Sequence, residues 1–138
     1  MKVQLKRVNG AVHFEGSGAS SDLKVHIDGP ADIGGQGLGA RPMELVLMAL
    51  ASCSSLDLVS ILQKQRQEIT DFSVDVEGTR REEIPQFFTK IHMIFRLQGT
   101  IDRAKAERAA ELAVKKYCSV HDMLASGGVE ITYELDLA

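Results

Sequence analysis

The chain has 138 residues, a length that predicts one domain, and 44% of its residues are hydrophobic while 25% are charged. Sixteen basic against nineteen acidic residues leave a net charge of −3, which argues against a nucleic-acid-binding or anionic-membrane-binding surface. No apolar segment is expected to approach the roughly 20 residues of a membrane-spanning helix. The start, residues 1–7, alternates in charge and lacks an apolar signal core. We therefore expect a single cytoplasmic domain over residues 1–138.

The first quarter of the chain predicts small strands followed by a loop. Apolar and polar residues alternate over 3–7, 12–14 and 23–27, as in half-buried strands. Asn9-Gly10, between the first two strands, is a strong signal for a two-residue hairpin turn. Five glycines within residues 29–39 then predict an irregular loop. Such a loop is either flexible or shaped to lie closely against something.

A long helix is expected from Pro42. Proline suits the first helical position, and Glu44 places a negative charge in the first turn. Residues 45–51 are apolar without interruption, and apolar residues continue to Leu62. About 24 residues would make a helix of roughly 36 Å. A helix that is apolar on all sides is buried on all sides. Because the predicted strands are too few to cover it, we expect a second subunit to do so.

The second half predicts two strands, two helices and a closing strand. Residues 72–77 and 88–97 alternate as strands on either side of a charged loop at 79–85. Asp102 is expected to cap an amphipathic helix, and Ser119 to cap a short one. The buried face of the first of these helices is expected to hold Ala106, Ala109, Ala110, Ala113 and Tyr117.

The last segment, 129–137, alternates cleanly. The order βββ-α-ββ-αα-β predicts an α+β fold, with a mostly antiparallel sheet wrapped around the long central helix.

Two cysteines carry the candidate chemistry. Cys53 lies in Leu-Met-Ala-Leu-Ala-Ser-Cys-Ser-Ser-Leu-Asp, where three serines surround the thiol, and Cys118 lies in Lys-Lys-Tyr-Cys-Ser-Val-His-Asp-Met-Leu. Neither belongs to a C-x-x-C motif, and a chain without an export signal is expected to keep both as thiols. One alternative is a pair of inert buried cysteines. A weaker one is a zinc site, which would need His92 and His121 to converge on them from separate elements.

These segments resemble the OsmC/Ohr family, named for osmotically inducible protein C and organic hydroperoxide resistance protein. The resemblance rests on Pro42-Met-Glu-Leu, on the apolar helix that holds Cys53, and on Cys118-Ser-Val about 65 residues later. It covers essentially the whole chain and is greatest for the YhfA-like branch, through Val59-Ser-Ile-Leu-Gln-Lys. It implies an OsmC-like fold in an intertwined homodimer, with the thiol-peroxidase sites at the interface.

The resemblance also implies roles for the two cysteines. Cys53 would attack an organic hydroperoxide and become a sulfenic acid, and Cys118 would condense with it to a disulfide. A dithiol reductant, lipoyl-type or smaller, would restore the pair. No metal, flavin or haem cofactor is implied.

In the family, an arginine held by a glutamate activates the attacking thiol. Arg41 and Glu44 are the candidates here, although Met43 stands where the family's glutamate is usual, and Arg80 or Arg81 are the other arginines that could serve. Glu44 precedes Cys53 by about 13.5 Å along one helix. It would therefore reach Cys53 of the other subunit, provided that the two helices cross antiparallel.

The hypothesis that best accounts for these features is that the protein is a cysteine-based peroxidase for organic hydroperoxides. Two alternatives remain open. One is a non-enzymatic dimer of the same fold that senses oxidants or binds a small apolar ligand, and the other is a structural protein with inert thiols.

Overall fold

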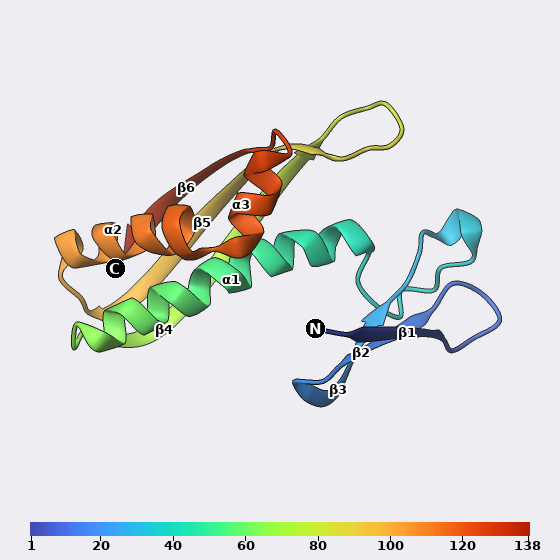
Figure 1. Ribbon diagram of the computed structural model, residues 1–138, viewed down its shortest axis with the longest axis horizontal. Coiled ribbons are helices and arrows are strands. Elements are labelled where there is room, and N and C mark those ends of the chain that lie inside the picture. The colour runs from blue at the N-terminus through green and yellow to red at the C-terminus, as the bar shows by residue number, and fades with distance from the viewer. The chain divides into compact units, whose positions relative to one another are not determined.

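The computed structural model describes residues 1–138, and its elements follow the predicted order (Figure 1). The first half contains β1 (Val3–Arg7), β2 (Phe14–Gly18), β3 (Ser21–Ile27), a short 3-10 turn η1 (Ala31–Ile33) and helix α1 (Pro42–Lys64). The second half contains β4 (Glu68–Arg80), β5 (Phe88–Thr100), α2 (Arg103–Glu111), a π-helical segment η2 (Leu112–Tyr117), α3 (Ser119–Ser126) and β6 (Glu130–Leu137). The α+β class is confirmed. The chain divides into two compact units, Met1–Val46 and Leu47–Ala138, which we describe separately.

The first unit is built on the antiparallel sheet β1-β2-β3. The two-residue turn expected at Asn9-Gly10 is wrong, because residues 8–13 connect β1 to β2. The Asn9 side chain accepts hydrogen bonds from the backbone N–H groups of Ala11 (3.0 Å) and His13 (3.1 Å). This asparagine thus organises a wider loop through its own side chain, which is a common alternative to a tight hairpin turn.

The glycine-rich loop of the first unit is closed around a single carboxylate. Asp28 is only 2% exposed. One of its oxygens accepts the N–H of Gly29 (2.8 Å), and the other accepts those of Gln36 (2.9 Å) and Leu38 (3.0 Å). A Cβ atom at Gly35 would lie 1.7 Å from the Gly29 carbonyl oxygen, so glycine is required there for the close approach. Of the two forms expected for this loop, the closely shaped one is observed.

The second unit is built on the sheet β4-β5-β6. β4 pairs antiparallel with β5, whereas β6 pairs parallel with β5. The parallel pairing requires a crossover connection, which α2, η2 and α3 provide. The sheets of the protein are therefore mostly antiparallel, as predicted, with β5–β6 as the one parallel pair.

One face of the β4-β5-β6 sheet forms the core of the second unit. Ile91, Met93, Phe95 and Leu97 of β5 are at most 1% exposed. Helix α1 adds Leu50, Leu58 and Leu62, and α2 adds three alanines, all fully buried (Ala106, Ala109 and Ala110). Figure 1 shows the helices of this unit gathered along the sheet.

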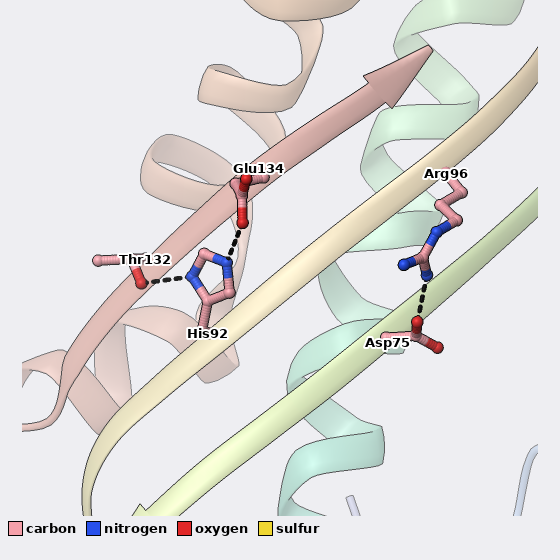
Figure 2. Close-up of polar contacts among 5 residues, drawn as sticks. All are labelled: Asp75, His92, Arg96, Thr132 and Glu134. Atoms are coloured by element: carbon pink, nitrogen blue, oxygen red, sulfur yellow. Dashed lines mark hydrogen bonds and ion pairs between the residues drawn. The ribbon is translucent and has the colours of Figure 1, made fainter. Parts of the chain in front are cut away.

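The opposite face of this sheet carries polar side chains (Figure 2). His92 contacts Thr132 Oγ1 through Nδ1 (2.7 Å) and Glu134 Oε2 through Nε2 (2.6 Å). Arg96 pairs with Asp75 on the neighbouring strand. Because residues alternate between faces along β5, His92 points away from the core that Met93 joins.

Helix α1 is buried along one stripe only. Leu50, Ser54, Leu58 and Leu62 recur every four residues and are fully buried, whereas Leu56 is 74% exposed and Met48 is 53% exposed. Burial on every side is therefore not achieved within one chain. The second subunit that we expect to cover the exposed side remains a prediction.

Helix α1 is also long and apolar enough to cross a membrane, by length and composition alone. It has 23 residues, and an 18-residue window within it reaches a mean hydropathy of 2.1. The expectation that no segment approaches this length is therefore wrong. Core helices of soluble proteins meet the same criterion, and α1 contributes a leucine stripe to the core of the second unit.

The predicted buried face of the α2 region is correct for its four alanines and wrong for Tyr117, which is 51% exposed. The cause is the π-helical segment Leu112–Tyr117, whose wider turn changes which of its residues face the core. Val114, which is 1% exposed, takes a buried position instead. The segment ends at Cys118.

Candidate functional site

The structure brings the two cysteines together. Cys53 comes from the middle of α1, and Cys118 comes from the junction between η2 and α3. The two thiols nevertheless lie close enough for Cys53 to raise the pKa of Cys118. Both are free thiols. Cys53 is partly exposed, whereas Cys118 is 1% exposed. Two thiols in contact, of which only one is open to solvent, form an arrangement that a single oxidation can convert into a disulfide.

The environment of Cys118 raises the pKa of its thiol above the ordinary value of 9.0. Burial is the largest cause, and the Cys53 thiol also raises this pKa, whereas the Ser54 side chain and the backbone N–H of His121 lower it. A buried thiolate lacks the hydration that it would have in water, so the neutral form is favoured. Cys118 is therefore a protonated thiol near neutral pH.

Cys118 also forms the N-cap of α3. Its Sγ accepts a hydrogen bond from the His121 backbone N–H at 3.3 Å. The predicted cap, Ser119, is wrong by one residue and lies inside the helix. The His121 imidazole contacts Asp122 Oδ1 at 3.2 Å, so His121 reaches the cysteine through its backbone and not through its ring.

The three serines around Cys53 have different surroundings. Ser52 Oγ donates to the carbonyl of Ala49 (3.2 Å), and Ser55 Oγ donates to that of Ala51 (2.7 Å). Ser54 is fully buried and makes no hydrogen bond of ordinary geometry, although its side chain acts on the Cys118 thiol. The sequence shows that serines are unusual neighbours of a cysteine. It does not predict that Ser54, unlike the other two, is buried without a hydrogen bond.

Arg41 and Glu44 lie at the start of α1, in the first unit. Glu44 Oε1 accepts a hydrogen bond from the Arg41 backbone N–H at 2.9 Å. This is the contact that the third helical residue makes in a capping box, where it satisfies the N–H of the residue before the helix. Both side chains are exposed. The structure therefore shows a helix-start role for Glu44, and its role toward Cys53 stays a prediction.

The other candidate arginines are bound to their own loop. Arg80 Nε donates to the Gln86 carbonyl (2.6 Å), and Arg81 Nε donates to the Pro85 carbonyl (2.6 Å). The Arg81 guanidinium also stacks on the Phe87 ring, 4.1 Å from its centroid. These contacts hold the loop between β4 and β5, as expected for a solvated loop.

The alternative zinc site is not assembled. His92 lies on the polar face of the sheet with Thr132 and Glu134, and no group of three or more His, Cys, Asp or Glu side chains is arranged to hold a metal ion.

An apolar groove runs beside α1 in the second unit. It has a volume of about 440 Å³, and its apolar lining comes from Leu56 and Val59 of α1 and from Phe72 of β4. Leu56 lies three residues after Cys53, a spacing that places neighbours on one side of a helix. A surface of this kind can accept a hydrocarbon group.

The architecture agrees with the comparisons to known proteins. Residues 35–134 match the family described as OsmC-like protein, and the chain belongs to this family. It is 39% identical over 138 residues to Protein YhfA of Escherichia coli strain K12, with 99% of this chain and 98% of that protein covered.

Two solved structures of other proteins share this fold at lower sequence identity. A hypothetical protein from Aquifex aeolicus VF5 is 29% identical, with a TM-score of 0.80 over 99% of this chain and 96% of that one. The organic hydroperoxide resistance protein OhrB of Bacillus subtilis is 24% identical, with a TM-score of 0.62 over 98% of this chain and 96% of that one. The second likeness concerns the fold alone. The expected OsmC/Ohr membership is thereby confirmed.

Proposed function

We propose that this protein is a thiol-dependent peroxidase that reduces organic hydroperoxides. The observation that carries the proposal is the contact between a partly exposed Cys53 and a buried Cys118, which lie about 65 residues apart in the sequence. Support comes from a structural relative that is named for organic hydroperoxide resistance. We place the activity in the cytoplasm, where thiols stay reduced between turnovers.

The exposure of the two thiols supports a different role for each. A peroxide must reach the attacking sulfur, and Cys53 is the more accessible of the two. The Cys53 thiolate attacks the distal oxygen of ROOH, the O–O bond breaks, and the alkoxide takes up a proton and leaves as ROH. Cys53 becomes a sulfenic acid, S–OH.

Cys118 then resolves the sulfenic acid. Its thiolate attacks the Cys53 sulfur, an S–S bond forms, and the S–O bond breaks to release hydroxide, which becomes water. The Cys118 sulfur is oxidised and the Cys53 sulfur is reduced by the same electron pair. A dithiol of lipoyl type or smaller then reduces the disulfide by thiol–disulfide exchange and is itself oxidised.

The thiolate and not the thiol is the nucleophile, and an ordinary cysteine is mostly protonated near neutral pH, so a nearby cation would favour the attacking form. We propose that Arg41, with Glu44, supplies this charge from a second subunit of a homodimer. An antiparallel crossing of two α1 helices would bring the start of one helix level with Cys53 of the other. The proposed active site is therefore shared between subunits.

The roles are tested by single-turnover oxidation with one equivalent of cumene hydroperoxide and no reductant. We expect the wild type to form a Cys53–Cys118 disulfide, and Cys53→Ser to consume no peroxide. Cys118→Ser should consume one equivalent and stop at a sulfenic acid that dimedone traps, as mass spectrometry would show. Ser73→Ala, at an exposed serine of β4, serves as the control and should behave as wild type.

Multiple turnover with excess dihydrolipoamide then separates the enzyme from its alternatives. Sustained consumption supports a peroxidase. A disulfide that forms once without sustained turnover would instead mean a redox sensor. If both cysteine variants consume peroxide as the wild type does, the thiols are bystanders and the proposal is overturned.

A further inference from the structure

Ser54 has a buried hydroxyl that the fold leaves without a partner. The residue is fully buried on the core stripe of α1, and its Oγ makes no hydrogen bond. A buried hydroxyl without a partner is unfavourable for stability, and such groups are rare in native proteins. Alanine would fill this helical position without that cost and with higher helix propensity. The presence of serine here therefore points to a need for the hydroxyl in some other state of the protein.

The neighbouring serines show that the lack of a hydrogen bond is particular to position 54 and is not a general property of serine in this helix. Ser52 and Ser55 each donate to a carbonyl of their own helix, which is the ordinary use of a helical serine. Ser54 does not, although it lies between them on the same helix. Its hydroxyl lies close enough to the Cys118 thiol to lower the pKa of that thiol, but without the geometry of an ordinary hydrogen bond.

We propose that Ser54 is a positioning residue that donates a hydrogen bond to the thiolate of Cys118 during the disulfide-forming step. The inference rests on the proposed peroxidase cycle, in which Cys118 must ionise to attack the Cys53 sulfenic acid. In the resting state Cys118 is a neutral thiol and a weak acceptor, so Ser54 gains little from it. When the thiolate forms, the hydroxyl gains a strong, charged acceptor.

The surroundings of Cys118 leave this task to two donors. The His121 backbone N–H already donates to the sulfur at 3.3 Å, from the first turn of α3. The Cys53 thiol is the titratable group that faces Cys118 from α1, and it disfavours the thiolate. The His121 ring is engaged with Asp122, and Cys118 itself is 1% exposed, so water has little access. Ser54 is the side-chain donor that remains.

The same hydroxyl also serves the reduction of the disulfide. When a dithiol attacks the Cys53 sulfur of the disulfide, the S–S bond breaks and the electron pair leaves on Cys118. A stabilised leaving thiolate departs faster. Ser54 would therefore assist both the formation of the disulfide and its reduction.

The direct test is the pKa of Cys118, measured by ¹³C NMR of protein labelled at the cysteine Cβ. In the Cys53→Ala variant Cys118 is the one remaining cysteine and gives the one labelled signal. Adding Ser54→Ala should raise the titration midpoint by about one pH unit, the size expected for a lost hydrogen bond to a charged group. Adding Ser52→Ala or Ser55→Ala should leave it unchanged. An unchanged midpoint in the Ser54→Ala variant overturns the inference.

The kinetic test uses Ser54→Ala with both cysteines present. Formation of the Cys53 sulfenic acid from one equivalent of cumene hydroperoxide should keep its rate. Disulfide formation should slow by about three- to tenfold at pH 7, because fewer thiolates form while each becomes somewhat more nucleophilic. The rate profile should move to higher pH. A uniform slowing of both steps at every pH would indicate a merely structural role and would overturn the inference.

The two tests separate the inference from the proposed function. The NMR titration involves no peroxide, so a raised midpoint supports the hydrogen bond even if the protein reduces no hydroperoxide. Circular dichroism and thermal unfolding of Ser54→Ala check the fold. The midpoint of unfolding should be equal to or above that of the wild type, because the variant removes an unpartnered buried hydroxyl. A lower midpoint would mean that the hydroxyl already stabilises the resting protein, and the inference would fall.

Discussion

At the scale of single residues, the two cysteines differ because of where they lie in their elements. Cys53 sits one position before the buried stripe of α1, so part of its side chain faces outward. Cys118 ends η2 and caps α3, which holds its sulfur inside the unit against the His121 N–H. Burial then keeps Cys118 protonated. The difference in exposure between the two thiols thus follows from the elements that hold them.

Asp28 is a single side chain that organises the glycine-rich loop around it. The backbone N–H groups of Gln36 and Leu38 hold the pKa of its carboxyl below the ordinary value of 3.8. The unfolded chain therefore binds this proton more readily than the folded one. The stabilisation is present above about pH 3.8 and is lost as the pH falls through the lower folded-state pKa.

We predict that Asp28→Asn lowers the midpoint of urea unfolding at pH 7, because an amide presents one acceptor oxygen to three N–H donors. The deficit relative to the wild type should shrink as the pH is lowered below the folded-state pKa of Asp28. Asp32→Asn, an exposed acid in the same loop, is the matched control and should change little. Equal midpoints for the two variants at pH 7 would show that Asp28 does not hold the loop.

At the scale of elements, periodicity in the sequence predicts most of the fold. The helix expected from Pro42 is observed as Pro42–Lys64, and Asp102 caps α2 by accepting the Lys105 N–H at 2.9 Å. These features are local, since they depend on residues within one or two turns. Alternation likewise locates the strands of both sheets, although β4 begins four residues before the predicted start at Phe72.

The features that could not be predicted from the sequence depend on tertiary packing, or on which of two neighbouring side chains accepts the hydrogen bond at a helix start. The π-helical turn at Leu112–Tyr117 has no residue signature, and it moves Val114 inward and Tyr117 outward. Cys118 caps α3 although a serine is the next residue and the better capping type. The burial of Ser54 comes from tertiary packing against its stripe of α1. In contrast, the pairing of Cys53 with Cys118 is anticipated through the family resemblance and not through spacing.

At the scale of the whole molecule, apolar residues remain exposed on both units. In the second unit Leu56 of α1 is 74% exposed, and in the first unit Val3 and Leu23 of the small sheet are 80% and 82% exposed. Single exposed apolar residues are ordinary, but contiguous sets of them mark interaction surfaces. An active site shared between subunits, as we propose, requires a second copy of the chain to cover such a surface.

We predict a dimer at micromolar concentration, measured by sedimentation velocity. Leu56→Glu should weaken the dimer, because it would place a charge in an apolar interface. Ile84→Glu is the matched control, since Ile84 is 91% exposed on the charged loop between β4 and β5 and should leave the dimer intact. A wild-type protein that sediments as a folded monomer would contradict the shared active site as well as the dimer.

The last prediction concerns the choice of peroxide, and it depends on the apolar surface near Cys53. The groove beside α1 offers about 440 Å³ lined in part by Leu56, Val59 and Phe72. Burying an alkyl group is worth about 0.8 kcal/mol per methylene, so four carbons would contribute about 3 kcal/mol. If that energy is retained in the transition state, it corresponds to roughly a hundredfold in kcat/KM.

Hydrogen peroxide has no apolar part with which to gain this energy. Allowing for incomplete burial, we expect cumene hydroperoxide to exceed hydrogen peroxide by at least about tenfold in kcat/KM. The two peroxides also differ in intrinsic reactivity, so the ratio should be divided by the same ratio measured for a free thiol such as N-acetylcysteine. A corrected ratio near one would mean that the protein does not recognise the alkyl group. The thiols could then still reduce peroxides, but organic hydroperoxides would no longer be the preferred substrate class.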